Sequence, residues 1–213
     1  MTEQEARDWL RLDMGVSRET MGAVERFVEM LCRENERQNL VSRESLKIVW
    51  ARHIVDSAQL LAHAPAPGAR WVDLGSGPGL PGLVIALLRS GRVTLVEERR
   101  QRVDFLERAV EELGLVDRVE ILGARVETLA PRRFDVISAH AFAPLDRLLA
   151  LGERFAASET RWVLPKGKNS EVELDAARRS WQGDFRLEPS LTASDAKIVV
   201  AERVRRRGKG TGQ

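Results

Sequence analysis

The sequence predicts an α/β protein in which a mostly parallel sheet carries helices on both faces and follows a helical extension. Up to about residue 65, the apolar residues recur at helical spacing. After residue 69, short β-rich runs alternate with glycine-rich turns and amphipathic segments, a pattern typical of parallel sheets. Two final β-rich runs have no helix between them and therefore predict an antiparallel hairpin at the sheet edge.

Two main helices are expected before residue 65. The first has its cap at Ser17 and an apolar stripe formed by Met21, Val24, Phe27, Val28 and Leu31. The second begins at Ser42 or Ser45 and ends at the Pro-Ala-Pro-Gly run of residues 65–68.

The remaining elements follow one another in short alternation. The predicted strands are residues 70–74, 92–96, 119–122, 134–138, 161–164, 185–188 and 197–204. The predicted helices between them are residues 80–88, 101–113 and 144–155. We therefore divide the chain into a helical extension over residues 1–65, a core domain over residues 66–204 and a basic tail over residues 205–213.

Composition excludes several classes of protein. A chain of 213 residues, 43% hydrophobic and 31% charged, can bury a core and is not disordered. The longest apolar run, residues 80–88, is too short to cross a membrane, and the acidic start is unlike a signal peptide, so we expect a cytosolic protein. One cysteine, Cys32, cannot form an internal disulfide, and the three histidines lack metal-ligand spacing.

Charge is nearly balanced, with 34 Lys and Arg against 32 Asp and Glu, so affinity for a polyanion must come from local patches. The clearest patch is terminal and contains Arg203, Arg205, Arg206, Arg207 and Lys209. It either contacts phosphates or is a solubilising tail.

The most informative segment is residues 71–82, Trp-Val-Asp-Leu-Gly-Ser-Gly-Pro-Gly-Leu-Pro-Gly. In open parallel sheets, ligands bind where loops leave the carboxyl ends of the strands, and Gly75, Gly77 and Gly79 let the backbone approach a ligand closely. The spacing from Gly77 to Gly82 also fits dinucleotide-binding proteins, so spacing alone does not identify the adenosine cofactor.

Asp73 ends the first predicted strand. We expect its carboxylate to face the ligand, where it would repel a diphosphate and attract the ammonium group of S-adenosylmethionine. Pro78 and Pro81 withhold amide donors that a diphosphate would use. Both features favour S-adenosylmethionine over a nicotinamide dinucleotide. The alternative is that Asp73 is an ordinary turn residue.

Two further strand ends complete a nucleoside site. Glu97 ends the second strand, where a carboxylate accepts hydrogen bonds from a ribose diol, unless it is merely a charged loop residue. Backbone groups near Val126, after the third strand, can read the edge of an adenine ring. Glu127 either belongs to this site or favours the positive end of a helix.

These segments together resemble the bacterial small-subunit rRNA guanine-N7 methyltransferases, also called glucose-inhibited division protein B. The resemblance covers about residues 20 to 200 and includes, beside the glycine loop, residues 39–42, 52–57, 95–97, 105–106, 125–127, 138–143 and 165–168. Its most specific parts are the Arg-His-x-x-Asp-Ser helix and the Lys-Gly-Lys segment.

The resemblance implies a class I methyltransferase fold with a Rossmann-like, mostly parallel seven-stranded sheet. It also implies S-adenosylmethionine as cofactor and methylation of one guanine of 16S rRNA at N7. The implied cofactor contacts are Gly75, Leu80, Val126, Glu127 and His140. Relatives usually have arginine at position 140; the histidine is shorter and only partly charged near neutral pH, so it is either a weaker contact or a histidine satisfied at a strand end.

The chemistry of N7 explains why no catalytic motif is visible. Guanine N7 carries a lone pair and no proton, so its attack on a sulfonium methyl group needs no general base. We expect catalysis by alignment of N7, methyl and sulfur, with donors near O6. The lack of tyrosine and of an Asn-Pro-Pro-Tyr loop argues against methylation of an exocyclic amine, and Cys32 does not suit a cysteine nucleophile.

Six residues are candidates for holding the guanine or nearby phosphates, namely Arg52, His53, Asp56, Ser57, Lys166 and Lys168. His53, Asp56 and Ser57 share one helical face and can point together at the cleft. The alternatives are that the helical group locks the extension onto the sheet, and that the two lysines form a plain surface turn.

Three functions compete at this point. The first is an rRNA methyltransferase whose partner is 16S rRNA or the assembling small subunit, acting as a monomer without metal or membrane contact. The second is a nicotinamide-dependent oxidoreductase, disfavoured by Asp73, the prolines and the lack of a Tyr-x-x-x-Lys pair. The third is a non-catalytic RNA-binding or regulatory protein on the same scaffold, favoured only by His140.

Overall fold

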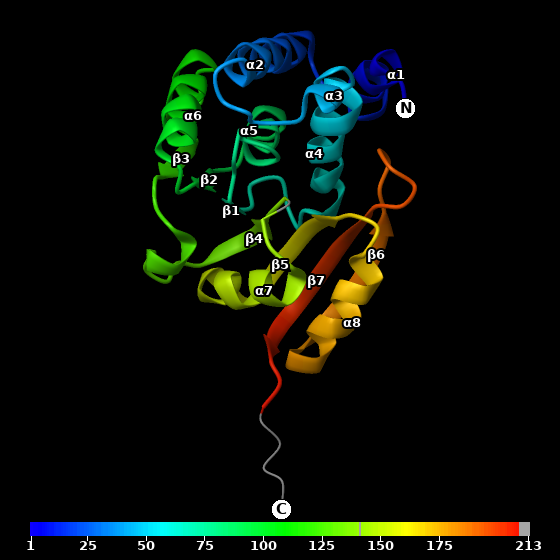
Figure 1. Cartoon of the computed structure of the whole chain (residues 1–213), viewed down its shortest axis with the longest axis vertical. Helices are drawn as coiled ribbons and strands as arrows, with labels where there is room; N and C mark the ends of the chain where they lie inside the picture. Colours follow the sequence, from blue (N-terminus) through cyan, green and yellow to red (C-terminus); the bar gives the residue numbers. More distant parts are fainter. Residues whose placement is uncertain (141, 209–213) are drawn as a thin grey trace, which may run out of the picture.

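A seven-stranded sheet forms the centre of the protein in a computed structural model that describes residues 1–140 and 142–208. The strand order is β3-β2-β1-β4-β5-β7-β6. The strands are β1 (Trp71–Leu74), β2 (Val93–Val96), β3 (Val119–Leu122), β4 (Phe134–Ser138), β5 (Ala156–Lys166), β6 (Trp181–Pro189) and β7 (Lys197–Arg206). The strands β1 to β5 pair in parallel, whereas β7 runs antiparallel to β5 and β6. The predicted parallel sheet and edge hairpin are therefore confirmed (Figure 1).

Helical segments cover both faces of the sheet. They are α1 (Glu3–Asp8), η1 (Trp9–Asp13), α2 (Arg18–Asn35), α3 (Arg43–Leu46), η2 (Trp50–Val55), α4 (Asp56–Ala58), η3 (Gln59–His63), α5 (Gly82–Leu88), α6 (Arg100–Glu112), η4 (Val126–Thr128), α7 (Leu145–Gly152), η5 (Glu153–Phe155) and α8 (Ser170–Ser180). Side chains of a strand alternate between faces. In β1, Trp71 therefore packs with the N-terminal helices, α5 and α6, whereas Val72 and Leu74 pack with α7 and α8.

The N-terminal helices follow the predicted caps. The Ser17 hydroxyl accepts a hydrogen bond from the Thr20 N–H at 3.1 Å, which caps α2. Ser42, and not Ser45, caps α3. The second expected helix is interrupted after α3 and resumes as η2, α4 and η3. Apolar side chains before and after residue 65 share one core, and the domain boundary at that residue stays a prediction.

Several features of the C-terminal half differ from prediction, including β6, which begins four residues before the predicted strand of residues 185–188. The helix α8 was not predicted, because only its small inward face, with Leu174 and Ala177, is apolar and buried. The strand β5 begins five residues early, since residues 156–160, Ala-Ala-Ser-Glu-Thr, are mostly exposed and include no large apolar side chain. The strand β7 includes Arg205 and Arg206 of the predicted tail, and Arg206 pairs with Glu153 at 3.0 Å; Lys209 lies outside the described residues.

Candidate functional site

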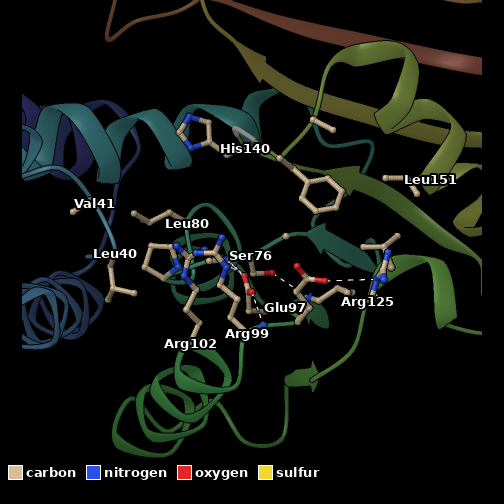
Figure 2. A pocket seen from close by; sticks show the side chains of 18 of the residues that line it. Leu40, Val41, Ser76, Leu80, Glu97, Arg99, Arg102, Arg125, His140 and Leu151 are labelled. Carbon is tan, nitrogen blue, oxygen red and sulfur yellow. Dashed lines mark hydrogen bonds and ion pairs between the residues drawn. The ribbon is translucent and has the colours of Figure 1, made fainter. Parts of the chain in front are cut away.

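The carboxyl ends of β1, β2, β3 and β4 meet at one cavity of about 640 Å³. The loops that follow these strands line it, together with Leu40, Val41 and the π-helical turn η2 from the N-terminal extension (Figure 2). Parallel strands bring their carboxyl ends to the same edge of a sheet, which is why the lining residues from Gly75 to Leu151 converge here. A cavity of this size suits a small-molecule cofactor.

The glycine loop after β1 lines one wall of the cavity. The N–H groups of Gly75 and Ser76 both donate to the Val96 carbonyl at 2.9 Å, which ties this loop to the end of β2. Gly75 and Gly77 have φ angles of +70° and +54°, a region that residues with side chains rarely adopt. Both glycines and Leu80 line the cavity, as predicted.

Two residues of the loop segment lie behind the cavity. A Cβ on Gly79 would meet Leu83 Cδ1 at 2.5 Å, so this glycine permits close packing and not ligand approach. The Asp73 side chain is fully buried, and its carboxylate accepts hydrogen bonds from the Ser138 hydroxyl at 2.8 Å and the Gly82 N–H at 3.2 Å. The expectation that Asp73 faces the ligand is therefore wrong.

Burial also changes the protonation of Asp73. Desolvation raises the pKa of this carboxyl from 3.8 to about 6, although hydrogen bonds from Ser138, Ser76 and Gly82 act in the opposite direction. Asp73 thus joins β1, β4 and the start of α5 from inside the protein.

Glu97 occupies the predicted place at the end of β2. Its carboxylate accepts hydrogen bonds from the N–H groups of Gly77 and Arg99, both at 2.9 Å, and the Arg102 guanidinium lies 3.8 Å away. The two backbone bonds fix the carboxylate at the cavity wall, while each oxygen keeps acceptor capacity. This arrangement fits a ribose diol.

The residues after β3 also line the cavity as predicted. Val126 is buried, whereas Glu127 stands at the rim, 3.6 Å from Arg125 and 3.9 Å from Arg147. A hydrogen bond from its own backbone N–H and the nearby Arg125 charge hold the pKa of Glu127 below its usual value. Glu127 is therefore ionised and paired with rim arginines.

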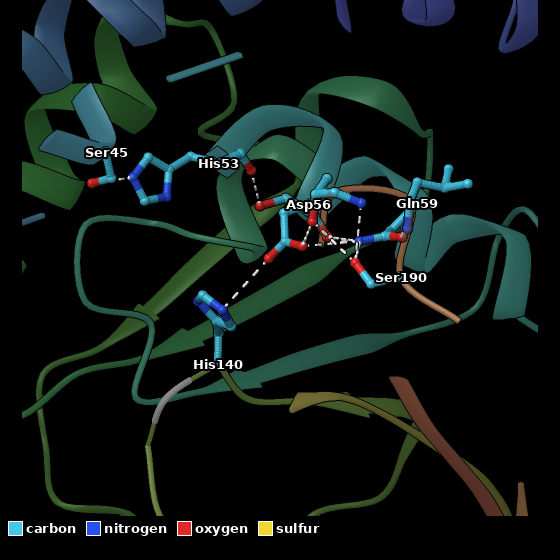
Figure 3. A network of polar contacts seen from close by, with 9 residues as sticks. Ser45, His53, Asp56, Gln59, His140 and Ser190 are labelled. Carbon is cyan, nitrogen blue, oxygen red and sulfur yellow. Dashed lines mark hydrogen bonds and ion pairs between the residues drawn. The ribbon is translucent and has the colours of Figure 1, made fainter. Parts of the chain in front are cut away.

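His140 reaches the cavity from the end of β4, and Asp56 supports it from behind (Figure 3). The His140 Nε2 lies 3.5 Å from one Asp56 oxygen. The other oxygen accepts hydrogen bonds from Gln59 Nε2 at 2.9 Å and from the Thr192 hydroxyl at 2.5 Å. Burial lowers the pKa of His140, as does the Arg52 charge, whereas Asp56 raises it. Asp56 itself does not line the cavity, contrary to expectation.

The helical face predicted to point at the cleft divides into two parts. Arg52 and His53 line the cavity, and Ser45 Oγ lies 2.9 Å from His53 Nε2. Burial, followed by the charges of His140 and Arg52, lowers the pKa of His53 to about 4, so this imidazole is neutral at physiological pH. The Ser57 hydroxyl donates to the His53 carbonyl at 2.6 Å and remains inside the helix.

The two predicted lysines lie off the cavity. The Lys166 ammonium donates to the Ala143 carbonyl at 2.7 Å and pairs with Glu173 at 2.9 Å, with only 10% of its side chain exposed. It anchors the loop after β4 to α8. Lys168 is exposed beyond the end of β5. Neither lysine is placed to hold a guanine in the cavity.

Sequence reasoning missed several cavity residues. Arg99 and Arg102 follow Glu97 closely, and their position after a ligand-binding strand end was a usable signal. Phe142 belongs to the recognised segment 138–143, but no spacing distinguishes it from a core aromatic residue. Arg147 reaches the rim only through the packing of α7.

Two negative findings apply to residues 1–140 and 142–208. No group of three His, Cys, Asp or Glu side chains there could hold a metal ion. No helix in that part of the chain is long and apolar enough to cross a membrane.

The fold and site define a class I S-adenosylmethionine-dependent methyltransferase. The sheet, with β7 inserted antiparallel between β5 and β6, is similar to that of a methyltransferase from Geobacter sulfurreducens, with a TM-score of 0.56, 19% identity and coverage of 85% of this chain and 88% of that chain. A ribosomal protein L11 methylase from Lactobacillus delbrueckii subsp. bulgaricus gives a TM-score of 0.56 at 14% identity, covering 76% of this chain and 80% of that chain. These likenesses establish the fold alone.

Sequence comparison identifies the family within this class. The rRNA small subunit methyltransferase G family matches residues 20–199. Ribosomal RNA small subunit methyltransferase G of Rhizorhabdus wittichii is 52% identical over 212 residues, covering 99% of this chain and 97% of the relative. The protein of the same name from Zymomonas mobilis is 46% identical over 221 residues, which cover 100% of this chain and 99% of that relative. The chain therefore belongs to the rRNA small subunit methyltransferase G family, as the sequence resemblance implied.

Proposed function

We propose that this protein transfers the methyl group of S-adenosylmethionine to N7 of a guanine in 16S rRNA. One observation carries the proposal: a single cavity joins the glycine loop and Glu97, which suit a nucleoside cofactor, to a rim of five arginines, which suits a nucleic acid. The rim arginines are Arg52, Arg99, Arg102, Arg125 and Arg147.

The cofactor half of the cavity is built from backbone and one carboxylate. Gly75 and Gly77 leave the loop surface free of side chains, and Glu97 offers acceptors for ribose hydroxyls. Val126 lies after β3, where an adenine ring can be read by the backbone. S-adenosylmethionine, when bound, supplies an electrophilic methyl group on a sulfonium.

The RNA half of the cavity depends on local charge, because the whole chain carries a net charge of only +2. Arginines at the rim can hold backbone phosphates and so set the register of the RNA without reading its sequence. The neutral His53 imidazole adds a hydrogen-bonding group to this wall without adding charge.

The reaction itself requires little acid–base chemistry from the protein. The N7 lone pair attacks the methyl carbon while the carbon–sulfur bond breaks, and no proton has to leave the guanine first. The protein then acts by holding the two reactants in line and by excluding water. Arg52, His53 and His140 line the cavity beside one another in sequence or in space and are our candidates for donating hydrogen bonds toward O6.

The regiochemistry is testable with 16S rRNA from a strain that lacks the modification. Incubation with the protein and S-adenosylmethionine is expected to produce one N7-methylguanosine, detected by reduction and aniline cleavage of the RNA. Methylation at another atom would contradict the proposal. Parallel reactions on free 16S rRNA and on assembled subunits identify which form is the substrate, and light scattering tests the proposed monomer.

Two titrations separate the competing functions. S-adenosylhomocysteine is expected to bind and NAD is not; binding of NAD alone would support the oxidoreductase. Binding of S-adenosylhomocysteine without methyl transfer to either form of the RNA would support a non-catalytic scaffold.

A further inference from the structure

Phe142 is an aromatic residue in an unusual environment. The chain has six Phe and five Trp residues and no Tyr. Phe142 is 36% exposed and is the one aromatic among the large exposed apolar side chains of residues 1–140 and 142–208. The rest of the side chain is covered, so Phe142 is a half-buried aromatic residue with part of its surface open.

The ring lies at the cavity, beside the glycine loop. Phe142 lines the cavity and follows β4, the parallel neighbour of β1. A Cβ built on Gly75 would meet Phe142 Cδ2 at 2.2 Å, so the ring rests directly against this glycine. The phenyl group therefore stands where the loop after β4 meets the first turn of the cofactor loop.

The surroundings of the ring are those of a base-binding site. Five arginines line the same cavity and can hold phosphates of a bound strand. Enzymes that modify a base act on single-stranded nucleic acid or bring the base out of its stack, and proteins hold unstacked bases against aromatic side chains. Among the described residues that line the cavity, Phe142 is the only Phe, Trp or Tyr, and the other aromatic rings are the imidazoles of His53 and His140.

We propose that Phe142 is a substrate-binding residue whose ring stacks on the target guanine and positions it beside the Gly75 end of the cofactor site. This inference rests on the proposed function. The alternative is that the Phe142 ring packs against the cofactor. The ring would then also be buried on binding, but Phe142 would be a cofactor contact and not a substrate contact.

The matched variants are Phe142→Leu, which keeps the side chain apolar without a flat face, and Phe142→Trp, which restores one. Stacking of one base on an aromatic ring strengthens binding roughly 5- to 150-fold. Phe142→Leu should therefore lower kcat/KM for 16S rRNA by a factor of roughly 5 to 150. Phe142→Trp should restore most of it. Both variants should bind S-adenosylhomocysteine within about twofold of wild type. Val172→Ala, in an exposed residue of α8 that is 72% accessible, is the control and should change neither value.

A second measurement needs no turnover. An rRNA fragment is made with 2-aminopurine in place of the guanine that the wild-type protein methylates. Its fluorescence should be quenched more strongly by Phe142→Trp than by Phe142→Leu, because a tryptophan stacked on the base quenches it.

The outcomes separate the two proposals. Absence of N7-methylguanosine with the wild-type protein would defeat the proposed function. Wild-type activity with unchanged kcat/KM in Phe142→Leu would overturn the stacking alone. A loss of S-adenosylhomocysteine affinity as large as the loss of kcat/KM would also overturn it and make Phe142 a cofactor contact.

Discussion

The substitution Asp73→Asn should remove a pH dependence from the stability of this protein. The Asp73 carboxyl is fully buried, and burial raises its pKa in the folded protein to about 6 from 3.8. Asparagine is nearly isosteric and retains an acceptor for the Gly82 N–H. The variant therefore has no charge to bury, and its NH2 group replaces the oxygen that accepts from the Ser138 hydroxyl, a change whose effect does not depend on pH.

The sign follows from proton binding. Between pH 3.8 and about 6, the folded protein holds the Asp73 proton while the unfolded chain has lost it. The free energy of unfolding contributed by Asp73 is therefore highest below pH 3.8, falls as the pH rises and is constant above about pH 6. A pKa difference of about two units makes the total fall about 3 kcal/mol.

Urea unfolding of both proteins at pH 5 and pH 7.5 measures this effect. The stability of wild type minus that of Asp73→Asn should decrease by about 1 to 1.5 kcal/mol between these pH values, the part of the fall that lies above pH 5. Taking the difference between the two proteins at each pH cancels the contributions of the other titrating groups to stability. A difference that is constant or rises with pH would refute the reasoning, since it would mean that the buried carboxyl has an ordinary or depressed pKa.

Three further substitutions test the site. Gly82→Ala should destabilise the fold by about 1 to 3 kcal/mol in urea, since its Cβ would lie 2.2 Å from a buried leucine of β2. Glu97→Gln should weaken S-adenosylhomocysteine binding about tenfold or more by calorimetry, whereas Glu98→Gln, with a side chain 58% exposed, should not. Thr192→Val should cost about 1 kcal/mol of stability, because it removes the hydroxyl donor to Asp56.

Each substitution also has an outcome that contradicts its premise. An unchanged urea midpoint for Gly82→Ala would show that α5 can shift away from β2. Equal affinities for the two glutamate variants would place the ribose elsewhere. An unchanged free energy of unfolding in Thr192→Val would mean that contacts within its own helix hold Asp56 without help from the loop after β6.

Local signals in the sequence were sufficient for most of the fold. Strand periodicity identified β3 and β4 with correct bounds, and Ser17 marked the start of α2. The helix α8 was not predicted, because its two buried apolar residues give only a weak helical periodicity. Such signals depend only on neighbours in the chain, which is why they are readable without the fold.

The site was predictable where chemistry and strand ends coincide. Gly75, Gly77, Leu80, Glu97, Val126, Glu127 and His140 were expected at the cavity and line it. Gly75, Gly77, Glu97, Val126 and Glu127 follow from the rule that loops leave parallel strands at one edge, whereas Leu80 and His140 came only from the family resemblance. Their contacts with the cofactor stay predictions.

The sequence by itself determined the class of sheet, the glycine loop and the carboxylate of Glu97 at the end of β2. Only the tertiary structure decided that Asp73 turns inward to Ser138, that Asp56 meets Thr192 from a loop 136 residues away, and that Phe142 rests on Gly75. The physical reason is that the direction of a side chain at a strand end depends on the register of the neighbouring strands and on what packs above them. Those partners are distant in the chain and leave no local periodicity to read.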